Sequence, residues 1–311
     1  MSLAAQGWDQ PDAVRVRVPG KINLALLVGP RGDDGYHELA TIFQAVSLFD
    51  EVTATLAPAD ITCTMRGAMA TGVGAGIDNL AVRAADLLRQ EYDIDAGVEL
   101  TIDKSIPVAG GMAGGSADAA GTLVACARLW QLSADDAELA ELGARLGADV
   151  PFLISGGCAL GLGRGQRLTP TLSRGSYHWV LAMSDHGLST PEVYARFDHL
   201  AAQAGRTPAS PDLPRELMMA LAAGNPREVG QHLVNDLEPP AFSLAPSLRT
   251  LLGVGRRAGA LGGLVSGSGP TVAFLACDED SATNLALELS SQGVAHQIRI
   301  VTGPVPGATV I

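Results

Sequence analysis

The chain of 311 residues has few cysteines, few aromatic residues and no long apolar run. Its four cysteines lie far apart and have small or apolar neighbours: Cys63, Cys126, Cys158 and Cys277. This spacing favours free thiols in a reducing compartment over disulfides or a zinc site. Because there is no apolar stretch of bilayer length and no apolar leader within residues 1–12, the sequence predicts a cytoplasmic protein with no membrane partner.

Positive charge is also scarce. The formal net charge of −12 disfavours nucleic acid and anionic membrane surfaces as partners, and an anionic ligand would need local donors. Only two of the 21 basic residues are lysines, Lys21 and Lys104, and the other 19 are arginines. Such a bias is usually genomic drift, so the two lysines either remain by chance or mark places that need a compact ammonium.

Apolar residues are plentiful at 47% and predict a sizeable core. Alternation of Val14, Val16 and Val18 with arginines predicts a strand, and a second strand is predicted after Pro19-Gly20. Asp78 and Ser133 are the predicted helix caps. That second strand covers 21–28. Further strands are predicted over 42–56, 98–102, 179–183, 272–276 and 297–301, and helices over 79–92, 116–130, 191–199, 214–222, 226–237, 246–259 and 281–291.

The order of these elements mixes strands and helices without strict βαβ alternation. We therefore predict an α+β fold. The length allows two lobes that share a cleft, and the polar stretch 167–176 is the candidate boundary. This boundary divides the chain into residues 1–170 and 171–311.

A glycine-rich segment at 107–118, PVAGGMAGGSAD, links a predicted strand to a predicted helix. Its glycines let backbone N–H groups converge, and the start of the following helix adds positive potential, so the segment predicts a phosphate site. Ser116 supplies a hydroxyl there. The segment is neither a Walker A loop nor a G-x-G-x-x-G motif, so the alternative is a flexible loop before a helix.

Two charged residues are candidates for phosphoryl-transfer chemistry. Lys21 and Asn23 point to the same face of a strand, although a lone strand lysine most often lies on a solvated face. Asp149 follows a helix, where an aspartate is most often a cap or turn residue. A carboxylate, a lysine and a phosphate loop together are the parts that transfer to a hydroxyl needs.

Two further turns could lie beside a ligand. Tyr36 and His37 follow the turn at Asp34-Gly35 and could stack on and hydrogen-bond a base, or could simply begin a strand. The turn VSGSGP at 265–270 could bring backbone close to a ligand or only to a neighbouring loop.

Three segments in order, PGKINL at 19–24, the loop at 107–118 and VSGSG at 265–269, resemble the GHMP kinase superfamily over nearly the whole chain. The resemblance implies a ribosomal protein S5 domain 2-like N-terminal lobe, a C-terminal α+β lobe and a ligand cleft between them. DGYH at 34–37, LGADVP at 146–151 and NDLE at 235–238 are similar to the branch that phosphorylates the C2 hydroxyl of a cytidylylated methylerythritol for the non-mevalonate isoprenoid route.

The resemblance implies a role for each matching residue. Lys21 and Asp149 would be the catalytic pair, with Asp149 the base. The substrate would contact Asn23, Tyr36, His37 and Thr190, with Tyr36 stacked on the cytosine and His37 hydrogen-bonded to it. The nucleotide would be held by Asn79, Lys104 and the loop residues Pro107, Val108, Ala109, Gly110, Gly111, Met112, Ala113, Gly114, Gly115, Ser116 and Ala117.

The implied cofactors are ATP and Mg²⁺, and the implied partner is the small cytidylylated substrate. No acidic Mg²⁺ ligand is evident in the sequence, so the metal would be held mainly by ATP, Ser116 and water. The protein would be a monomer or weak homodimer. Two alternatives are a homoserine or mevalonate-type kinase and a non-catalytic nucleotide-binding regulator, and the presence of both Lys21 and Asp149 argues against the regulator.

Overall fold

The computed structural model describes residues 11–184 and 187–311. Within these residues no helix has the length and hydrophobicity that a bilayer crossing requires. The segment for which the sequence predicts no leader, 1–12, lies mostly outside the described residues.

Two sheets organise the molecule. The larger has the strand order β12-β1-β2-β4-β3, with β5 and β6 continuing from β2 and β8 paired to β1. Its strands are β1 (Ala13–Arg31), β2 (His37–Ala57), β3 (Ile61–Arg66), β4 (Gly97–Asp103), β5 (Cys158–Gly163), β6 (Arg167–Pro170), β8 (Val234–Asn235) and β12 (Thr309–Val310). The smaller sheet has the order β11-β7-β10-β9, from β7 (Tyr177–Met183), β9 (Gly262–Val265), β10 (Val272–Ala276) and β11 (Gln297–Gly303).

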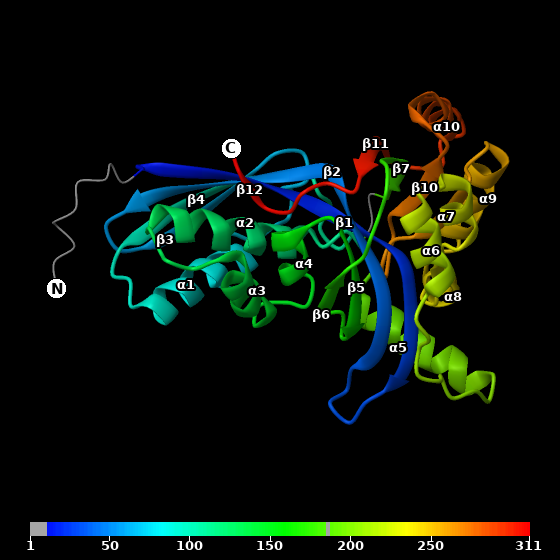
Figure 1. Ribbon diagram of the computed structural model, residues 1–311, viewed down its shortest axis with the longest axis horizontal. Coiled ribbons are helices and arrows are strands. Elements are labelled where there is room, and N and C mark those ends of the chain that lie inside the picture. The colour runs from blue at the N-terminus through cyan, green and yellow to red at the C-terminus, as the bar shows by residue number, and fades with distance from the viewer. Residues whose placement is uncertain (1–10, 185–186) are drawn as a thin grey trace.

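Helices cover the sheets in two groups (Figure 1). Four of them lie along one side of the larger sheet: α1 (Leu80–Tyr92), α2 (Gly114–Leu129), α3 (Asp136–Ala144) and α4 (Val150–Ser155). The others gather at the opposite end of the molecule: α5 (Thr190–Gln203), α6 (Arg215–Ala223), α7 (Pro226–Gln231), α8 (Glu238–Leu244), α9 (Ser247–Arg257) and α10 (Glu279–Ser291). This mixed arrangement confirms the predicted α+β class.

The long strand β1 corrects the prediction of two strands separated at Pro19-Gly20. Pro19 pairs with Phe49 and Gly20 pairs with Val46, so the chain continues through a bulge instead of turning. A proline fits in a strand at such a bulge, where the ladder is already interrupted. Before the bulge buried and exposed residues alternate, and after it both faces are covered, so Lys21 and Asn23 lie in the interior of the molecule.

Helix caps differ from the prediction by one or two residues. Asn79, not Asp78, caps α1, and its side-chain oxygen accepts the N–H of Ala81. Asp135, not Ser133, caps α3 and accepts the N–H of Glu138. In each case the residue in extended backbone just before the first turn takes the capping position.

The predicted helix over 226–237 is wrong in its second half. The chain ends α7 at Gln231 and then forms β8, where Val234 pairs with Ala25 of β1. Pairing with an edge of β1 therefore overrides local helical periodicity. The final strand, β12, likewise returns to pair with β1, and neither this strand nor β3 was predicted. The predicted boundary at 170/171 falls between β6 and β7, which belong to different sheets, and it stays a prediction.

Candidate active site

The phosphate loop connects β4 to α2. Ala109 and Ala113 have left-handed backbones with φ of 53° and 60°, and Gly111 has φ of 76°. Ala113 precedes α2 without a side-chain cap, and no acidic residue lies in the first turn of the helix. The N–H groups of this turn therefore keep their capacity to bind an anion at the positive end of a 16-residue helix.

The loop is packed against the turn at 265–270. A Cβ at Gly111 would lie 1.9 Å from the carbonyl oxygen of Ser266, so only glycine allows this approach. The Ser266 hydroxyl donates to the Gly111 carbonyl at 2.9 Å, and the Thr271 N–H donates to the Gly110 carbonyl at 3.3 Å. The turn at 265–270 thus packs directly against the glycine-rich loop at 107–118 and helps to hold its shape.

A pocket of about 400 Å³ joins the loop to the predicted catalytic pair. Lys21 Nζ lies 4.0 Å from Asp149 Oδ2 and donates to Asn23 Oδ1 at 2.7 Å. The Asn23 amide donates to Thr41, whose hydroxyl donates to the Ala25 carbonyl. This chain of bonds fixes Lys21 and Asn23 on the pocket floor, while Asp149 keeps 31% of its side chain exposed. Seven loop residues also line this pocket: Ala109, Gly110, Gly111, Ala113, Gly114, Gly115 and Ser116.

The electrostatics of the floor depend on Lys21. Burial lowers its pKa, and the nearby Asp149 carboxylate partly opposes this shift. A buried ammonium with one amide partner and a carboxylate beyond hydrogen-bond distance has N–H groups available for a further anionic group. The floor therefore combines a poorly solvated lysine with a partly exposed carboxylate.

A second, adjoining pocket of about 690 Å³ contains the turn residues. Tyr36 is 57% exposed, and the guanidinium of Arg164 lies 3.8 Å from its ring centroid. His37 is buried, with Nδ1 2.9 Å from the Gly29 carbonyl and Nε2 3.3 Å from Asp198. Because the carbonyl can only accept, Nδ1 carries a proton, and Nε2 is the ring atom that could meet a ligand.

Thr190 lies on the wall between the two pockets and borders both. Its hydroxyl is hydrogen-bonded to that of Ser268 at 2.8 Å, which joins α5 to the turn at 265–270. Ala148 and Leu39 also border both pockets, so the two spaces are contiguous.

Two residues of the site were missed from the sequence. Arg164 borders both pockets and forms an ion pair with Asp34 at 2.5 Å. Tyr194, on α5, also borders both and stacks on His37 with ring centroids 5.3 Å apart. Burial raises the pKa of the Tyr194 hydroxyl, and the nearby Asp149 carboxylate adds to this shift. The only signals in the sequence were an arginine between two glycines and one of four tyrosines in the chain.

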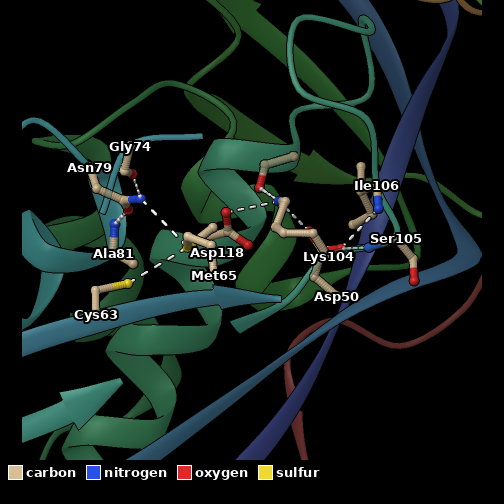
Figure 2. A network of polar contacts seen from close by, with 11 residues as sticks. Asp50, Cys63, Met65, Gly74, Asn79, Ala81, Lys104, Ser105, Ile106 and Asp118 are labelled. Atoms are coloured by element: carbon tan, nitrogen blue, oxygen red, sulfur yellow. Dashed lines mark hydrogen bonds and ion pairs between the residues drawn. The ribbon is translucent and has the colours of Figure 1, made fainter. Parts of the chain in front are cut away.

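Several residues predicted to contact the nucleotide lie apart from the loop pocket, or have side chains that are already bonded or buried, and their nucleotide contacts stay predictions. The Lys104 side chain has 0% exposure and is bound to Asp50 and Asp118, so its ammonium lies beneath the loop and not on a pocket surface (Figure 2). Both polar atoms of the Asn79 side chain are bound to backbone groups, of Ala81 and Gly74. Pro107 and Val108 line a different pocket of about 290 Å³, and the side chains of Met112 and Ala117 are buried.

Comparison with known proteins agrees with this geometry. The family model "GHMP kinases N terminal domain" matches residues 79–157, and "GHMP kinases C terminal" matches residues 217–295. A 4-diphosphocytidyl-2-C-methyl-D-erythritol kinase of Mycolicibacterium smegmatis is 50% identical over 307 residues, covering 99% of this chain and 95% of the relative. One of Rhodococcus jostii is 50% identical over 302 residues, covering 97% and 96%.

A solved structure agrees as well. A crystal structure of 4-(cytidine 5'-diphospho)-2C-methyl-D-erythritol kinase superposes with a TM-score of 0.74 at 34% identity, covering 92% of this chain and 98% of that one. The fold and the phosphate loop define an ATP-dependent small-molecule kinase of the two-lobed GHMP type. Within that class, the chain belongs to the 4-diphosphocytidyl-2-C-methyl-D-erythritol kinase family.

Proposed function

We propose that the chain transfers the γ-phosphoryl group of ATP to the C2 hydroxyl of 4-diphosphocytidyl-2-C-methyl-D-erythritol, in the non-mevalonate route to isoprenoid precursors. One observation carries the proposal: an aromatic pocket suited to a base adjoins the pocket of Lys21, Asp149 and the phosphate loop. A substrate with a base at one end and a reacting alcohol at the other can therefore occupy both at once.

The side chains at the pocket junction support this orientation. Tyr36 and Tyr194 offer two aromatic faces to a pyrimidine, and Nε2 of His37 can hydrogen-bond its polar edge. Arg164 and Arg31 line the same pocket and give it local positive charge. This charge favours a diphosphate, which the net charge of −12 would otherwise repel. Thr190 and Asn23 provide polar atoms toward the alcohol end.

In the proposed reaction the C2 oxygen attacks the γ-phosphorus while the bond to the β,γ-bridging oxygen breaks and ADP leaves. Asp149 accepts the hydroxyl proton, and Lys21 stabilises negative charge on the transferred group. The N–H groups at the start of α2 hold the phosphates in line with the acceptor.

The site offers few protein ligands to Mg²⁺. No cluster of three metal-ligating side chains occurs among residues 11–184 and 187–311, but the Ser116 hydroxyl and the Asp149 carboxylate both face the loop pocket. Oxygen donors of this kind suit Mg²⁺, whose other ligands would be phosphate oxygens and water. When bound, the ion neutralises charge that develops on the β- and γ-phosphates.

An ADP-release assay tests the proposal. We expect turnover with cytidylylated methylerythritol and none above background with homoserine or mevalonate, the acceptors of the alternative kinase types. CDP or CMP should also raise the melting temperature in the absence of ATP. Turnover with homoserine or mevalonate, without protection by CDP, would contradict the proposal.

Four further expectations stay predictions. They are a monomeric or weakly dimeric state, a lobe boundary at 170/171, a cytoplasmic location and the absence of nucleic acid and membrane partners.

A further inference from the structure

A buried ion cluster lies directly beneath the phosphate loop. The Lys104 ammonium, on the residue after β4, contacts Asp50 Oδ2 of β2 at 2.5 Å and Asp118 Oδ2 of α2 at 2.8 Å (Figure 2). The three side chains are at most 3% exposed. They therefore touch neither solvent nor, on this geometry, a ligand.

The cluster is bonded to both ends of the loop. Asp50 Oδ1 accepts the backbone N–H groups of Ser105 at 2.6 Å and Ile106 at 2.8 Å, where the chain enters the loop. Lys104 Nζ also donates to the Gly114 carbonyl at 3.1 Å, where the chain leaves the loop and α2 begins. One set of charges thus fixes the entry and the exit of the segment whose N–H groups face the nucleotide pocket.

Stability alone does not explain such a cluster. Charges removed from water lose hydration energy, and apolar side chains of similar volume often stabilise a core as well or better. Asp118 Oδ1 is buried without a hydrogen-bond partner, which adds an unfavourable contribution. Burial also raises the pKa of Asp118 to about 7, against the opposing effect of Lys104. What the cluster provides, and apolar residues could not, is a set of directional bonds to the loop backbone.

We propose that Lys104, Asp50 and Asp118 are positioning residues that hold the phosphate loop in its ATP-binding shape before ATP arrives. The inference rests on the proposed function only in assigning ATP to this loop. A loop already fixed at both ends loses less conformational freedom on binding, so the cluster acts on ATP affinity. The aromatic pocket that contains Tyr36 and Tyr194 has no residue of the cluster in its lining. Its affinity for a nucleobase should therefore not depend on the cluster.

Four variants test the proposal by titration calorimetry with a non-hydrolysable ATP analogue and, separately, with CDP. Lys104→Met removes the bond to Gly114. Lys104→Met with Asp50→Asn removes the same bond, retains an acceptor for Ser105 and Ile106, and leaves no unpaired buried charge once Asp118 is protonated. Asp118→Asn retains an acceptor for Lys104. Val124→Ala, in the buried part of α2 further along, is the control for general loss of core packing.

We expect Lys104→Met and the double variant to raise the dissociation constant for the ATP analogue about tenfold or more, while CDP affinity changes less than about threefold. Asp118→Asn and Val124→Ala should keep ATP affinity within about threefold. If Lys104→Met does not fold, the double variant carries the same comparison. The proposal is overturned if the double variant folds and binds the analogue like the parent, or if Val124→Ala weakens binding equally. Failure of CDP to bind the parent protein would count against the proposed substrate but leave the ATP comparison intact.

Discussion

The two lysines of the chain occupy regions that differ in the number and the distance of their acidic partners. Lys104 contacts two aspartates at 2.5 and 2.8 Å and has no exposed side-chain surface. Lys21 is nearly as buried, but the carboxylate of Asp149 beside it lies 4.0 Å away and is partly exposed. Both are the same residue type beside the same loop. A saturated ammonium can only hold structure together, whereas an unsaturated one still has donors for a substrate.

Among the variants that test this comparison, Asp149→Asn should have the largest effect on kcat. Removing the base should lower kcat by about 10²–10⁴ while the ATP analogue still binds, because an amide cannot accept the hydroxyl proton. Steady-state kinetics together with calorimetry measure both quantities. Glu141→Gln, the same charge change at an exposed position of α3, is the control and should leave kcat unchanged. An unchanged kcat in Asp149→Asn would remove this carboxylate from the mechanism.

Lys21→Met should come next, with kcat lower by about 10²–10³ because the transferred group loses an electrostatic partner. The contrast with Lys104→Met sharpens the comparison: the Lys21 change should act on kcat, and the Lys104 change on ATP affinity. Measuring kcat and the ATP dissociation constant for both variants decides the matter. The same pattern in both variants would show that the distance to the partner does not separate their roles.

Tyr36→Ala tests the adjoining aromatic pocket, which neither lysine lines. It should raise KM for the cytidylylated substrate roughly 5- to 30-fold with little change in kcat, because stacking on the base binds ground state and transition state alike. Tyr36→Phe retains the ring and should behave like the parent. A fall in kcat without a change in KM would argue against stacking.

The smallest effect concerns the pH dependence of stability. Burial raises the pKa of Asp118 from 3.8 to about 7, so the folded state binds a proton that the unfolded state releases. The contribution of Asp118 to stability is therefore complete below about pH 4 and is lost as pH rises toward 7. Asp118→Asn removes this dependence, and its free energy of unfolding relative to the parent should increase by about 2–3 kcal/mol from pH 5 to pH 8. Urea unfolding at both pH values measures the difference, and a constant difference would show that Asp118 does not titrate in this range.

Local patterns predicted much of the secondary structure. Alternation identified β4 and the start of β1, and apolar periodicity identified α1. Strands at β2, β7 and β10 and helices at α2 and α10 were also predicted within a few residues. The errors occur where a distant partner decides the outcome. Val234 and Asn235 form a strand because β1 presents an edge to them, and Pro19-Gly20 is a bulge because β2 continues alongside. Neither partner lies within the window that local periodicity samples.

The sequence by itself determined the backbone geometry that suits the loop at 107–118 to its predicted phosphate-binding role. Glycine spacing and small residues at the start of a helix act through local backbone geometry, and such geometry can be read from neighbouring positions. Only the tertiary structure decided which lysine faces the pocket, that Arg164 and Tyr194 border both pockets, and that Asp50, Lys104 and Asp118 meet beneath the loop. The reason is physical: burial and charge pairing depend on distances between β2, β4 and α2, and folding, not sequence proximity, sets those distances.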